Sequence, residues 1–427
     1  MRNVAVVGAG ICGCAAAYFA RKYLSSCKVT IYDSQDRIGG RILTHKEYGL
    51  NLELGASFFT HANKTIVDIV NEERLRVHEV KERSEFAVWN GSTLIYRSDK
   101  KAAITNLKLL LKYKLSVIRT FLLLNEAKKR VAQLYQEEQK KLAQTDNLFD
   151  RVGIKEWCSK TLDEILTEKG ASRTFIDELA CPITRTIYSQ NTNIAGFAGI
   201  SSLLGVYEAP IYRFSEGNST FPNHLAETSH ANVKLSWKID RIEKLSKGYK
   251  VYNGDKAEMF DGVIIAAPLE LAEIEFEGVT KPRWEQQLFQ PVFIKTMRGI
   301  LNSAYFGLDT SADIPSIILT TKNADPLKHC NIQKAGNHES IVTFSSTEPL
   351  ADEVFMEVFK GIVNPVLQCS WKAAYPVFTP LTRLPPTRLD EGLIYANSIE
   401  ASISSMETAA FSALNAVKTI HFDLLRK

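Results

Sequence analysis

The 427-residue sequence has no apolar run long enough to cross a membrane, since a spanning helix needs about 18 or more apolar residues in succession. Cysteine is scarce. The seven cysteines form no Cys-x-x-Cys pair, which argues against a disulfide scaffold or a structural zinc site. Neither sign of charge is in excess, because 52 Lys and Arg face 48 Asp and Glu and leave a net charge of +4. Nucleic-acid-binding domains usually have a pI above about 9, so we expect no nucleic-acid partner.

Histidine does not indicate a metal site or a hydrolytic triad either. None of the eight histidines stands at ligand spacing to another, and no serine-histidine-acid set is recognisable. With 45% hydrophobic and 23% charged residues, the composition is that of a folded globular protein. At roughly 100–200 residues per domain, the length predicts two or three domains.

The first segment of the chain has the pattern of a β-α-β unit. An apolar run at Val4–Val7 predicts a strand, Ile11–Tyr23 a helix of small residues, and Lys28–Tyr32 a second strand. Helical periodicity then dominates from 107 to 144, short strands follow Gly217, and the chain closes with a strand and a helix. This order predicts an α/β protein.

A glycine-rich turn between the first strand and the first helix carries the strongest functional signal. Gly8, Gly10 and Gly13 have the G-x-G-x-x-G spacing of a dinucleotide-binding loop, in the strand-turn-helix context that this loop requires. Asp33 ends the second strand, where a carboxylate accepts hydrogen bonds from an adenosine ribose. This fingerprint alone does not choose between NAD and FAD.

The segments that follow favour FAD. They resemble the glycine-pair and acidic-glycine motifs that flavin amine oxidase-like proteins place along FAD, and the residues concerned are Arg37, Gly39, Gly40, Arg41, Gly55, Ala56 and Ser57. A glycine pair lets backbone amides approach the cofactor, and Arg41 would supply a cation for the pyrophosphate.

Later stretches continue the same resemblance. Ile239 stands where these oxidases place a branched aliphatic residue against the adenine, and Asp261–Pro268 resembles the strand that returns to the FAD domain. Near the C-terminus, Glu400, Met406 and Glu407 lie in the closing strand and helix, whose N-terminal end would stabilise negative charge on the reduced flavin.

Together the motifs resemble the prenylcysteine oxidase family, also called prenylcysteine lyase. The stretches that carry this resemblance run through most of the chain and include 185–190, 197–203, 294–303, 318–321, 348–350, 370–376 and 395–401. The family oxidises S-farnesyl- or S-geranylgeranyl-cysteine with O2 and water to an isoprenoid aldehyde, cysteine and hydrogen peroxide. Two alternatives stay open: an amine oxidase-like flavoenzyme with another hydrophobic substrate, and a non-catalytic flavin- or lipid-binding paralogue. An NAD-linked reductase is disfavoured because only one dinucleotide fingerprint is evident.

The expected architecture is a discontinuous, Rossmann-like FAD-binding domain with an α+β substrate domain that includes a helical insertion. The FAD-binding segments are predicted at 1–65, 215–270 and 386–427, and the substrate regions at 66–214, which is helix-rich, and at 271–385. The resemblance assigns no catalytic residue.

A substrate of this class needs an apolar tunnel for the isoprenoid and a polar end for the cysteine zwitterion. Phe197–Leu204 and Trp371–Phe378 are candidate lining, with Arg185 or Tyr188 at the polar end. Related amine oxidases hold a water near the flavin with a lysine, but we interpret Lys295 as a solvated lysine rather than a catalytic one.

The stretch from 100 to 130 is unusually basic, with nine Lys and Arg against the single acid Glu126. Its interleaved leucines allow two interpretations: a basic amphipathic helix on an anionic membrane surface, or a solvated face over a buried apolar stripe. The family resemblance implies the lysosome, whereas no signal peptide is recognisable ahead of Val4, which would make a complete chain cytoplasmic. The oligomeric state is not predicted.

Overall fold

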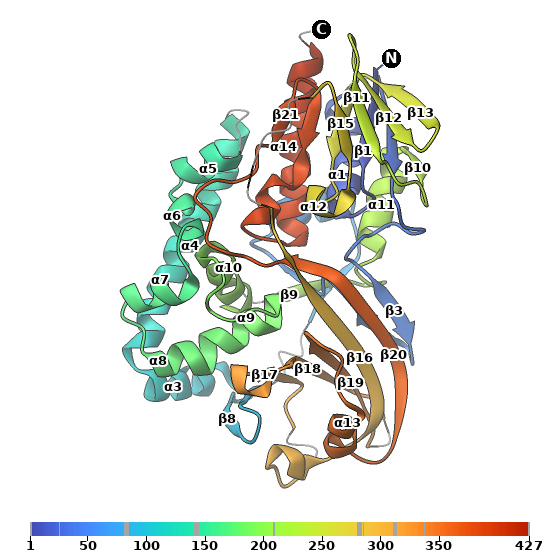
Figure 1. The fold of residues 1–427 in the computed structure, drawn as a ribbon. Helices are drawn as coiled ribbons and strands as arrows, with labels where there is room; N and C mark the ends of the chain where they lie inside the picture. The colour runs from blue at the N-terminus through green and yellow to red at the C-terminus, as the bar shows by residue number, and fades with distance from the viewer. Residues whose placement is uncertain are drawn as a thin grey trace.

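A six-stranded sheet assembled from three separate stretches of the chain organises the upper half of the molecule (Figure 1). The computed structural model describes residues 2–24, 26–80, 85–140, 145–207, 210–279, 284, 286–310, 314–336 and 338–425. The strand order is β10-β2-β1-β14-β22-β21, and every neighbouring pair is parallel except β22 with β21. The bounds are β1 Arg2–Val7, β2 Cys27–Tyr32, β10 Asn232–Lys234, β14 Gly262–Ile265, β21 Arg388–Asp390 and β22 Leu393–Tyr395.

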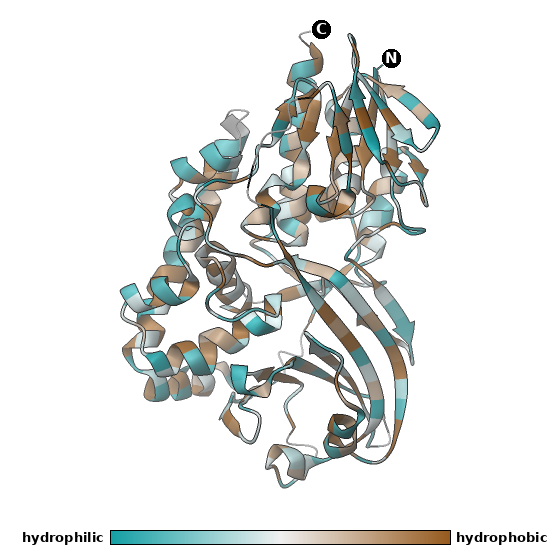
Figure 2. Ribbon diagram, viewed as in Figure 1, coloured by the Kyte–Doolittle hydropathy of each residue, from teal (hydrophilic) through white to brown (hydrophobic). Residues whose placement is uncertain are grey.

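Both faces of this sheet are covered, which is why its central strands are short apolar runs (brown in Figure 2). Helices α1, α11 and α14 cover one face, and α1 packs against both of the others. Small residues such as Ala16 and Ala413 are fully buried there and allow close packing. A four-stranded sheet covers the other face. The bounds are α1 Ile11–Tyr23, α11 Thr220–Ser229, α14 Met406–Leu425, β11 Arg241–Lys244, β12 Tyr249–Asn253, β13 Lys256–Phe260 and β15 Glu275–Glu277.

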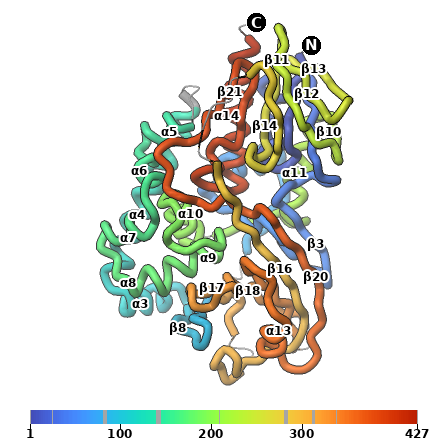
Figure 3. The backbone as a smooth tube through the Cα atoms, in the orientation of Figure 1, coloured from blue at the N-terminus to red at the C-terminus, as the bar shows by residue number. Residues whose placement is uncertain are grey.

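A seven-stranded sheet, in the order β20-β16-β19-β18-β17-β7-β8, forms the lower half. Strands β16 and β20 make a long antiparallel ribbon that extends up to the cofactor half, as the tube in Figure 3 shows. The bounds are β7 Phe86–Trp89, β8 Leu94–Arg97, β16 Phe289–Leu301, β17 Ile317–Thr320, β18 Leu327–Lys334, β19 Ser340–Ser346 and β20 Phe359–Pro376.

A layer of helices flanks this sheet on the left of Figure 1 and encloses its own hydrophobic core. The sequence pattern from 107 to 144 suggests one helical stretch. The structure instead breaks it at Lys114, which has a φ of 52°, and 141–144 lie outside the described residues. The bounds are α3 Ala102–Tyr113, α4 Leu115–Lys140, α5 Thr145–Arg151, α6 Ile154–Cys158, α7 Leu162–Glu168, α8 Arg173–Phe175, the π-helical turn Ile176–Ala180, α9 Cys181–Tyr188 and α10 Gly196–Tyr207.

The remaining elements are short, and the last of them, α13, packs on the seven-stranded sheet. They are β3 Thr44–Glu47, β4 Leu50–Glu53, β5 Phe59–Thr60, α2 Lys64–Glu72, β6 Val77–Glu79, β9 Ile211–Phe214, α12 Leu269–Ala272 and α13 Asp352–Val358. The seven cysteines are all free thiols. Within the ranges given above, no helix is long and apolar enough to span a membrane, and no group of three or more His, Cys, Asp or Glu side chains is arranged to hold a metal ion.

The α/β fold with a Rossmann-like portion is confirmed. The six-stranded sheet takes its strands from within 2–32, 232–265 and 388–395, and each stretch falls inside one of the three predicted FAD-binding segments. The exact domain limits stay a prediction.

Candidate functional site

The glycine-rich turn connects β1 to α1 and leaves the start of that helix open. Gly8 has a φ of +111°, which L side chains rarely adopt, and its N–H donates to the carbonyl of Tyr32 at 2.7 Å. A Cβ at Gly13 would lie 1.8 Å from the carbonyl oxygen of Gly8, so only glycine lets the helix pack this closely. At Gly10 the nearest atom to an added Cβ is 3.9 Å away, which leaves room for a phosphate at the helix N-terminus.

Asp33 lies beside this turn, at the end of β2. Its Oδ2 accepts a hydrogen bond from the N–H of Ala9 at 2.6 Å, and its Oδ1 accepts one from Gln35 at 2.8 Å. A carboxylate has about four acceptor positions, so capacity remains for ribose hydroxyls.

The glycine pair forms a turn that contacts the first loop. The N–H of Gly39 donates to the carbonyl of Ala9 at 2.9 Å, and a Cβ at Gly40 would lie 3.2 Å from the Cα of Gly10. The guanidinium of Arg37 donates to the carbonyl of Gly40 at 2.6 Å. Arg37 therefore stabilises the conformation of this turn. The role of the turn in binding FAD stays a prediction.

Arg41 and Glu400, far apart in sequence, form an ion pair beside these turns. Arg41 also donates to the carbonyl of Ala374 at 3.2 Å, and Ser404 donates to Oε1 of Glu400 at 2.9 Å. The other oxygen of Glu400, Oε2, is buried and has no hydrogen-bond partner among the described residues. Such a group needs a donor, and a flavin side-chain hydroxyl supplies one, so these residues fit FAD.

Three further residues predicted to contact FAD, Gly55, Ala56 and Ser57, follow one another beside Arg41, and their backbone atoms make the close contacts there. A Cβ at Gly55 would lie 2.0 Å from the carbonyl oxygen of Arg41, so this chain crossing also requires glycine. The carbonyls of Ala56 and Ser57 accept hydrogen bonds from Asn218 and Arg213, both at 2.9 Å. These hydrogen bonds engage the carbonyl groups of Ala56 and Ser57 within the protein and hold this segment in place.

Ile239 is buried, with 3% of its surface exposed, in the same apolar cluster as Val7 and Tyr32. Ile239 therefore belongs to the apolar cluster at the ends of β1 and β2, next to the glycine-rich turn. Its contact with the adenine stays a prediction.

Met406 and Glu407 begin α14, but the side chain of Glu407 is already engaged. Its two oxygens accept hydrogen bonds from the N–H groups of Thr65 and Ile66 at 2.8 and 3.0 Å, and Tyr135 donates to Oε1 at 2.7 Å. Burial raises the pKa of this carboxyl, opposed by those hydrogen bonds. Glu407 thus caps α2, and any FAD contact at this position falls to the N–H groups of the helix end.

Substitution of Glu400 tests the fit to the cofactor. We expect Glu400→Ala to weaken FAD retention roughly tenfold, because hydrogen bonds to a charged group contribute about 1.5–3 kcal/mol. Equilibrium dialysis of the apoprotein with FAD measures this change. The control is Glu353→Ala, at an exposed position on α13. Equal FAD affinity in both variants would contradict the placement.

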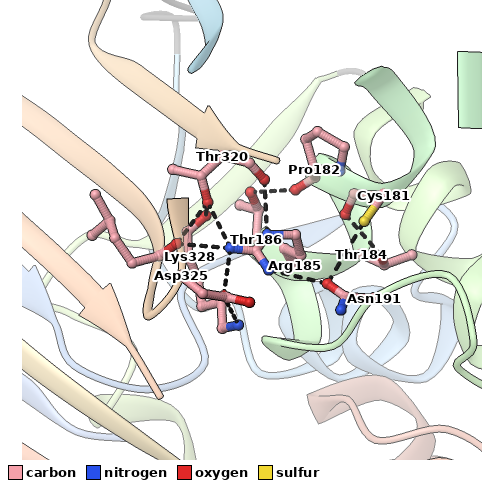
Figure 4. Close-up of polar contacts among 10 residues, drawn as sticks. Cys181, Pro182, Thr184, Arg185, Thr186, Asn191, Thr320, Asp325 and Lys328 are labelled. Atoms are coloured by element: carbon pink, nitrogen blue, oxygen red, sulfur yellow. Dashed lines mark hydrogen bonds and ion pairs between the residues drawn. The ribbon is translucent and has the colours of Figure 1, made fainter. Parts of the chain in front are cut away.

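Arg185 does not provide the polar end of a substrate site. It is fully buried and donates to the carbonyls of Thr320 and Leu327, both at 2.8 Å, and to Asn191 at 3.0 Å (Figure 4). It also forms an ion pair with Asp325 at 2.9 Å. Because every nitrogen of the guanidinium is engaged, this candidate from the sequence is wrong: Arg185 ties α9 to the seven-stranded sheet.

Tyr188 lies closer to the cofactor side. Its hydroxyl donates to the carbonyl of Ser404 at 2.9 Å, immediately before α14, and its ring contacts those of Tyr375 and Phe378 at 5.2 and 4.9 Å. The segment Trp371–Phe378 therefore does meet α9 in an aromatic cluster. The side chain of Lys295 is partly buried rather than solvated: it pairs with Asp352 at 3.0 Å and lies over the ring of Phe355. The interpretation of Lys295 as non-catalytic stays a prediction.

The inner face of the seven-stranded sheet carries a polar band that sequence reasoning missed. His329, Asn331 and Thr343 share this face, as the strand register shows. Apolar clusters lie on both sides of the band: one with Val88 and Leu319 towards the helices, the other towards the cofactor loops. The three polar side chains are only partly buried. The alternation of polar and apolar residues from 329 to 333 was the available signal.

The imidazole of His329 is neutral at physiological pH. Its Nδ1 is buried without a partner in the described part of the chain, and burial lowers its pKa to about 4. The unfolded chain would bind a proton near pH 6.5, so the free energy of unfolding should fall by roughly 2–3 kcal/mol as pH drops from 6.5 to 4.

We expect His329→Gln to remove that loss. Chemical denaturation at pH 4.5 and 7.0 measures the difference, and exposed His78→Gln is the matched control. The same pH dependence in wild type and His329→Gln would contradict a neutral imidazole at this position.

Comparison with known proteins adds two kinds of finding. The family model described as prenylcysteine lyase matches 96–427, and a model described as an NAD(P)-binding Rossmann-like domain matches 6–72. The chain is 27% identical to the farnesylcysteine lyase of Arabidopsis thaliana, over 98% of this chain and 88% of that protein. It is 27% identical to prenylcysteine oxidase 1 of Bos taurus, over 97% and 87%.

Among solved structures, the fold is similar to putrescine oxidase bound to putrescine, with a TM-score of 0.67, 15% identity and coverage of 100% of this chain and 99% of that one. It is also similar to cyclohexylamine oxidase from Brevibacterium oxydans, with a TM-score of 0.66, 15% identity and full coverage of both chains. At this identity the likeness concerns the fold alone.

Proposed function

This chain belongs to the prenylcysteine lyase family, and from that membership we propose that it is an FAD-dependent oxidase that cleaves the thioether of S-prenylcysteine. The observation that carries the proposal is the extent of the match, which begins at 96 and includes the helical layer, strands β16 to β20 of the seven-stranded sheet and the closing cofactor segment. A match limited to the dinucleotide-binding loop would have supported the binding of a cofactor but would not have indicated the substrate.

The reaction balances with O2 and water. Bound FAD would supply the two-electron acceptor for a hydride from the isoprenoid carbon next to sulfur. O2 would take the two electrons and the hydride's proton and, with the proton released when water adds to the oxidised carbon, would leave as hydrogen peroxide. The carbon loses hydride readily because the sulfur lone pair and the adjacent double bond share the developing positive charge. Water adds to that carbon, and the hemithioacetal breaks its C–S bond to give an isoprenoid aldehyde and free cysteine.

The chain's own task is to hold this substrate. In the aromatic cluster next to the start of α14, Tyr188 and Phe378 are buried and Tyr375 is partly exposed, so Tyr375 is the ring that would contact the isoprenoid. The polar band at His329 and Asn331 offers donors and acceptors to a cysteine zwitterion, a task that Arg185 cannot perform. With neutral imidazole at this position, the band can accept a hydrogen bond from an ammonium group or from water.

Substitution within the band tests this placement. We expect Asn331→Leu to raise KM for farnesylcysteine about tenfold with kcat within twofold, because one hydrogen bond to a charged group is lost. Steady-state peroxide production measures both constants. Asn364→Leu, at an exposed position of β20, is the control. Unchanged KM in Asn331→Leu would remove the polar band from the substrate site.

The decisive experiment on the function is anaerobic. Farnesylcysteine should bleach the visible flavin bands of the purified protein, and admitting air should restore them with release of peroxide. Bleaching by a hydrophobic amine but not by farnesylcysteine would instead support the amine oxidase-like alternative. A yellow protein that neither compound bleaches would support the non-catalytic alternative.

The finer parts of the proposal are O2 as the electron acceptor and a peripheral contact with a membrane surface, which suits a substrate with a hydrocarbon tail. A lysosomal location is proposed from the family resemblance alone, and fractionation of cells that express the tagged chain tests it. Glycosylation motifs of the form Asn-x-Ser/Thr stand at Asn63, Asn90 and Asn218. The side chain of Asn218 is fully buried and donates to the carbonyl of Ala56, so we expect no sugar there.

A further inference from the structure

Helices α3 and α4 and the end of α10 present an exposed apolar surface. Ten of the exposed large apolar side chains among the described residues fall within 104–122 and at 206–207. We call this surface the α3–α4 face and define it by six of them: Leu107, Leu111, Leu115, Phe121, Leu122 and Tyr207. The four leucines are between 55% and 71% exposed. A patch of this kind marks an interaction site rather than ordinary surface.

The α3–α4 face is continuous across its three helices. The rings of Phe121 and Tyr207 meet edge to face at 5.7 Å and join α4 to α10. The leucines on either side of the break at Lys114 connect α3 to α4. In Figure 2 the ribbon of α3, at the lower left, alternates between brown and teal, as a helix with mixed polarity does.

The apolar side chains on this face are not a misplaced core. The opposite side of α4 already packs Leu123, Leu124 and Ala127 into the helical core. Ser116 fixes the same helix to α8 through hydrogen bonds with Ser172 at 2.9 and 3.2 Å. A helix that is apolar on two sides, with only one side packed, needs a partner for the other.

The lysine side chains around the α3–α4 face indicate which kind of partner it would bind. Lys101, Lys114 and Lys129 are exposed at its margin, while Lys108 and Lys112 are paired with Asp99 and Glu178 at 3.3 and 2.8 Å. Two copies of the chain docked through this face would bring their lysines together, which like-charge repulsion opposes. An anionic bilayer complements both the leucines and the lysines.

We propose that the α3–α4 face docks the protein on the anionic surface of a lipid bilayer. The leucines enter the boundary between headgroups and acyl chains, and the lysines at the margin contact the headgroups. The inference rests on the proposed function in one respect, because an S-prenylcysteine partitions into a bilayer through its hydrocarbon tail. The docking itself does not depend on turnover.

Vesicle sedimentation tests the docking without substrate. The holoprotein should pellet with vesicles of phosphatidylserine and phosphatidylcholine at low salt and less with phosphatidylcholine alone. We expect Leu111→Glu/Leu122→Glu to lower the partition coefficient at least tenfold, and Lys101→Gln, Lys114→Gln and Lys129→Gln to lower it about fivefold each. The controls are Met356→Glu/Ile362→Glu and Lys247→Gln, exposed positions in α13, β20 and the β11–β12 turn.

The outcomes separate docking from catalysis. If the proposal holds, Leu111→Glu/Leu122→Glu keeps its flavin bands and its turnover of dispersed farnesylcysteine but loses turnover of substrate embedded in vesicles. Holoprotein that stays in the supernatant, or a variant that pellets like wild type, overturns the proposal. A wild-type dimer that becomes a monomer in the variant, without vesicle binding, would identify the face as an interface between copies. Vesicle binding with no turnover of any prenylcysteine would overturn only the proposed function.

Discussion

Gly10→Ala is expected to yield a folded protein that no longer retains FAD. A methyl group at position 10 meets no atom closer than 3.9 Å, so the fold accommodates it, but the methyl occupies the space through which the pyrophosphate approaches the helix N-terminus. The thermal unfolding midpoint should stay within a few degrees of the wild-type apoprotein, while the visible flavin absorbance is lost. Absorbance spectra and thermal scans of the purified variant measure the two properties separately.

Gly13→Ala should behave differently, because the added Cβ would lie 1.8 Å from the carbonyl oxygen of Gly8 and the backbone must move. We expect loss of FAD together with a fall in the free energy of unfolding of roughly 3 kcal/mol or more. Gly205→Ala, where nothing lies within 4 Å, is the control and should gain about 0.5–1 kcal/mol from helix propensity. Full flavin content in Gly10→Ala would contradict the placement of the pyrophosphate.

Arg185→Met is expected to destabilise the protein by roughly 3–5 kcal/mol without raising KM. The substitution removes the buried guanidinium that donates to the carbonyl of Thr320 and, together with the Thr320 hydroxyl, to the carbonyl of Leu327. It also removes one of the two cations that pair with Asp325, the other being Lys328. Urea denaturation of the holoprotein measures the change in stability, and peroxide production by the folded fraction gives KM.

Exposed Arg383→Met is the matched control and should stay within about 0.5 kcal/mol of wild type. A stable Arg185→Met with KM raised tenfold would return the arginine to the polar end of the substrate site. A destabilised variant with normal KM supports the arrangement in Figure 4.

The sequence determined those parts of the site that depend on local chain geometry. The spacing of Gly8, Gly10 and Gly13 is specific to one kind of turn between a strand and a helix. It can therefore be recognised in any sequence in which the β-α-β pattern can be recognised. The same holds for Gly39 and Gly40, which adopt positive φ in a tight turn. The cofactor class followed from these motifs together, because their order along the chain resembles that of flavin oxidases.

The tertiary structure decided the roles of polar side chains whose partners come from distant segments. A charged residue in a sequence suits either a ligand or a structural ion pair, and only packing shows which. Arg185 has Thr320 among its partners, 135 positions away, and the partners of Glu407 include the start of α2. His329 became visible only when the strand register placed it on the inner face of the sheet.

In the helical insertion, too, the sequence determined some properties and the tertiary structure decided others. Its basic and apolar composition was plain in the sequence, but periodicity alone does not tell a buried leucine from an exposed one when a helix is apolar on two sides. Packing against the core used Leu123 and Leu124 and left Leu111 and Leu122 in solvent. Local conformation is encoded by neighbouring residues, whereas burial depends on which distant surfaces meet. This is why the cofactor loop could be read from the sequence, whereas the sequence left the basic segment open between a membrane-surface helix and a solvated face over a buried stripe.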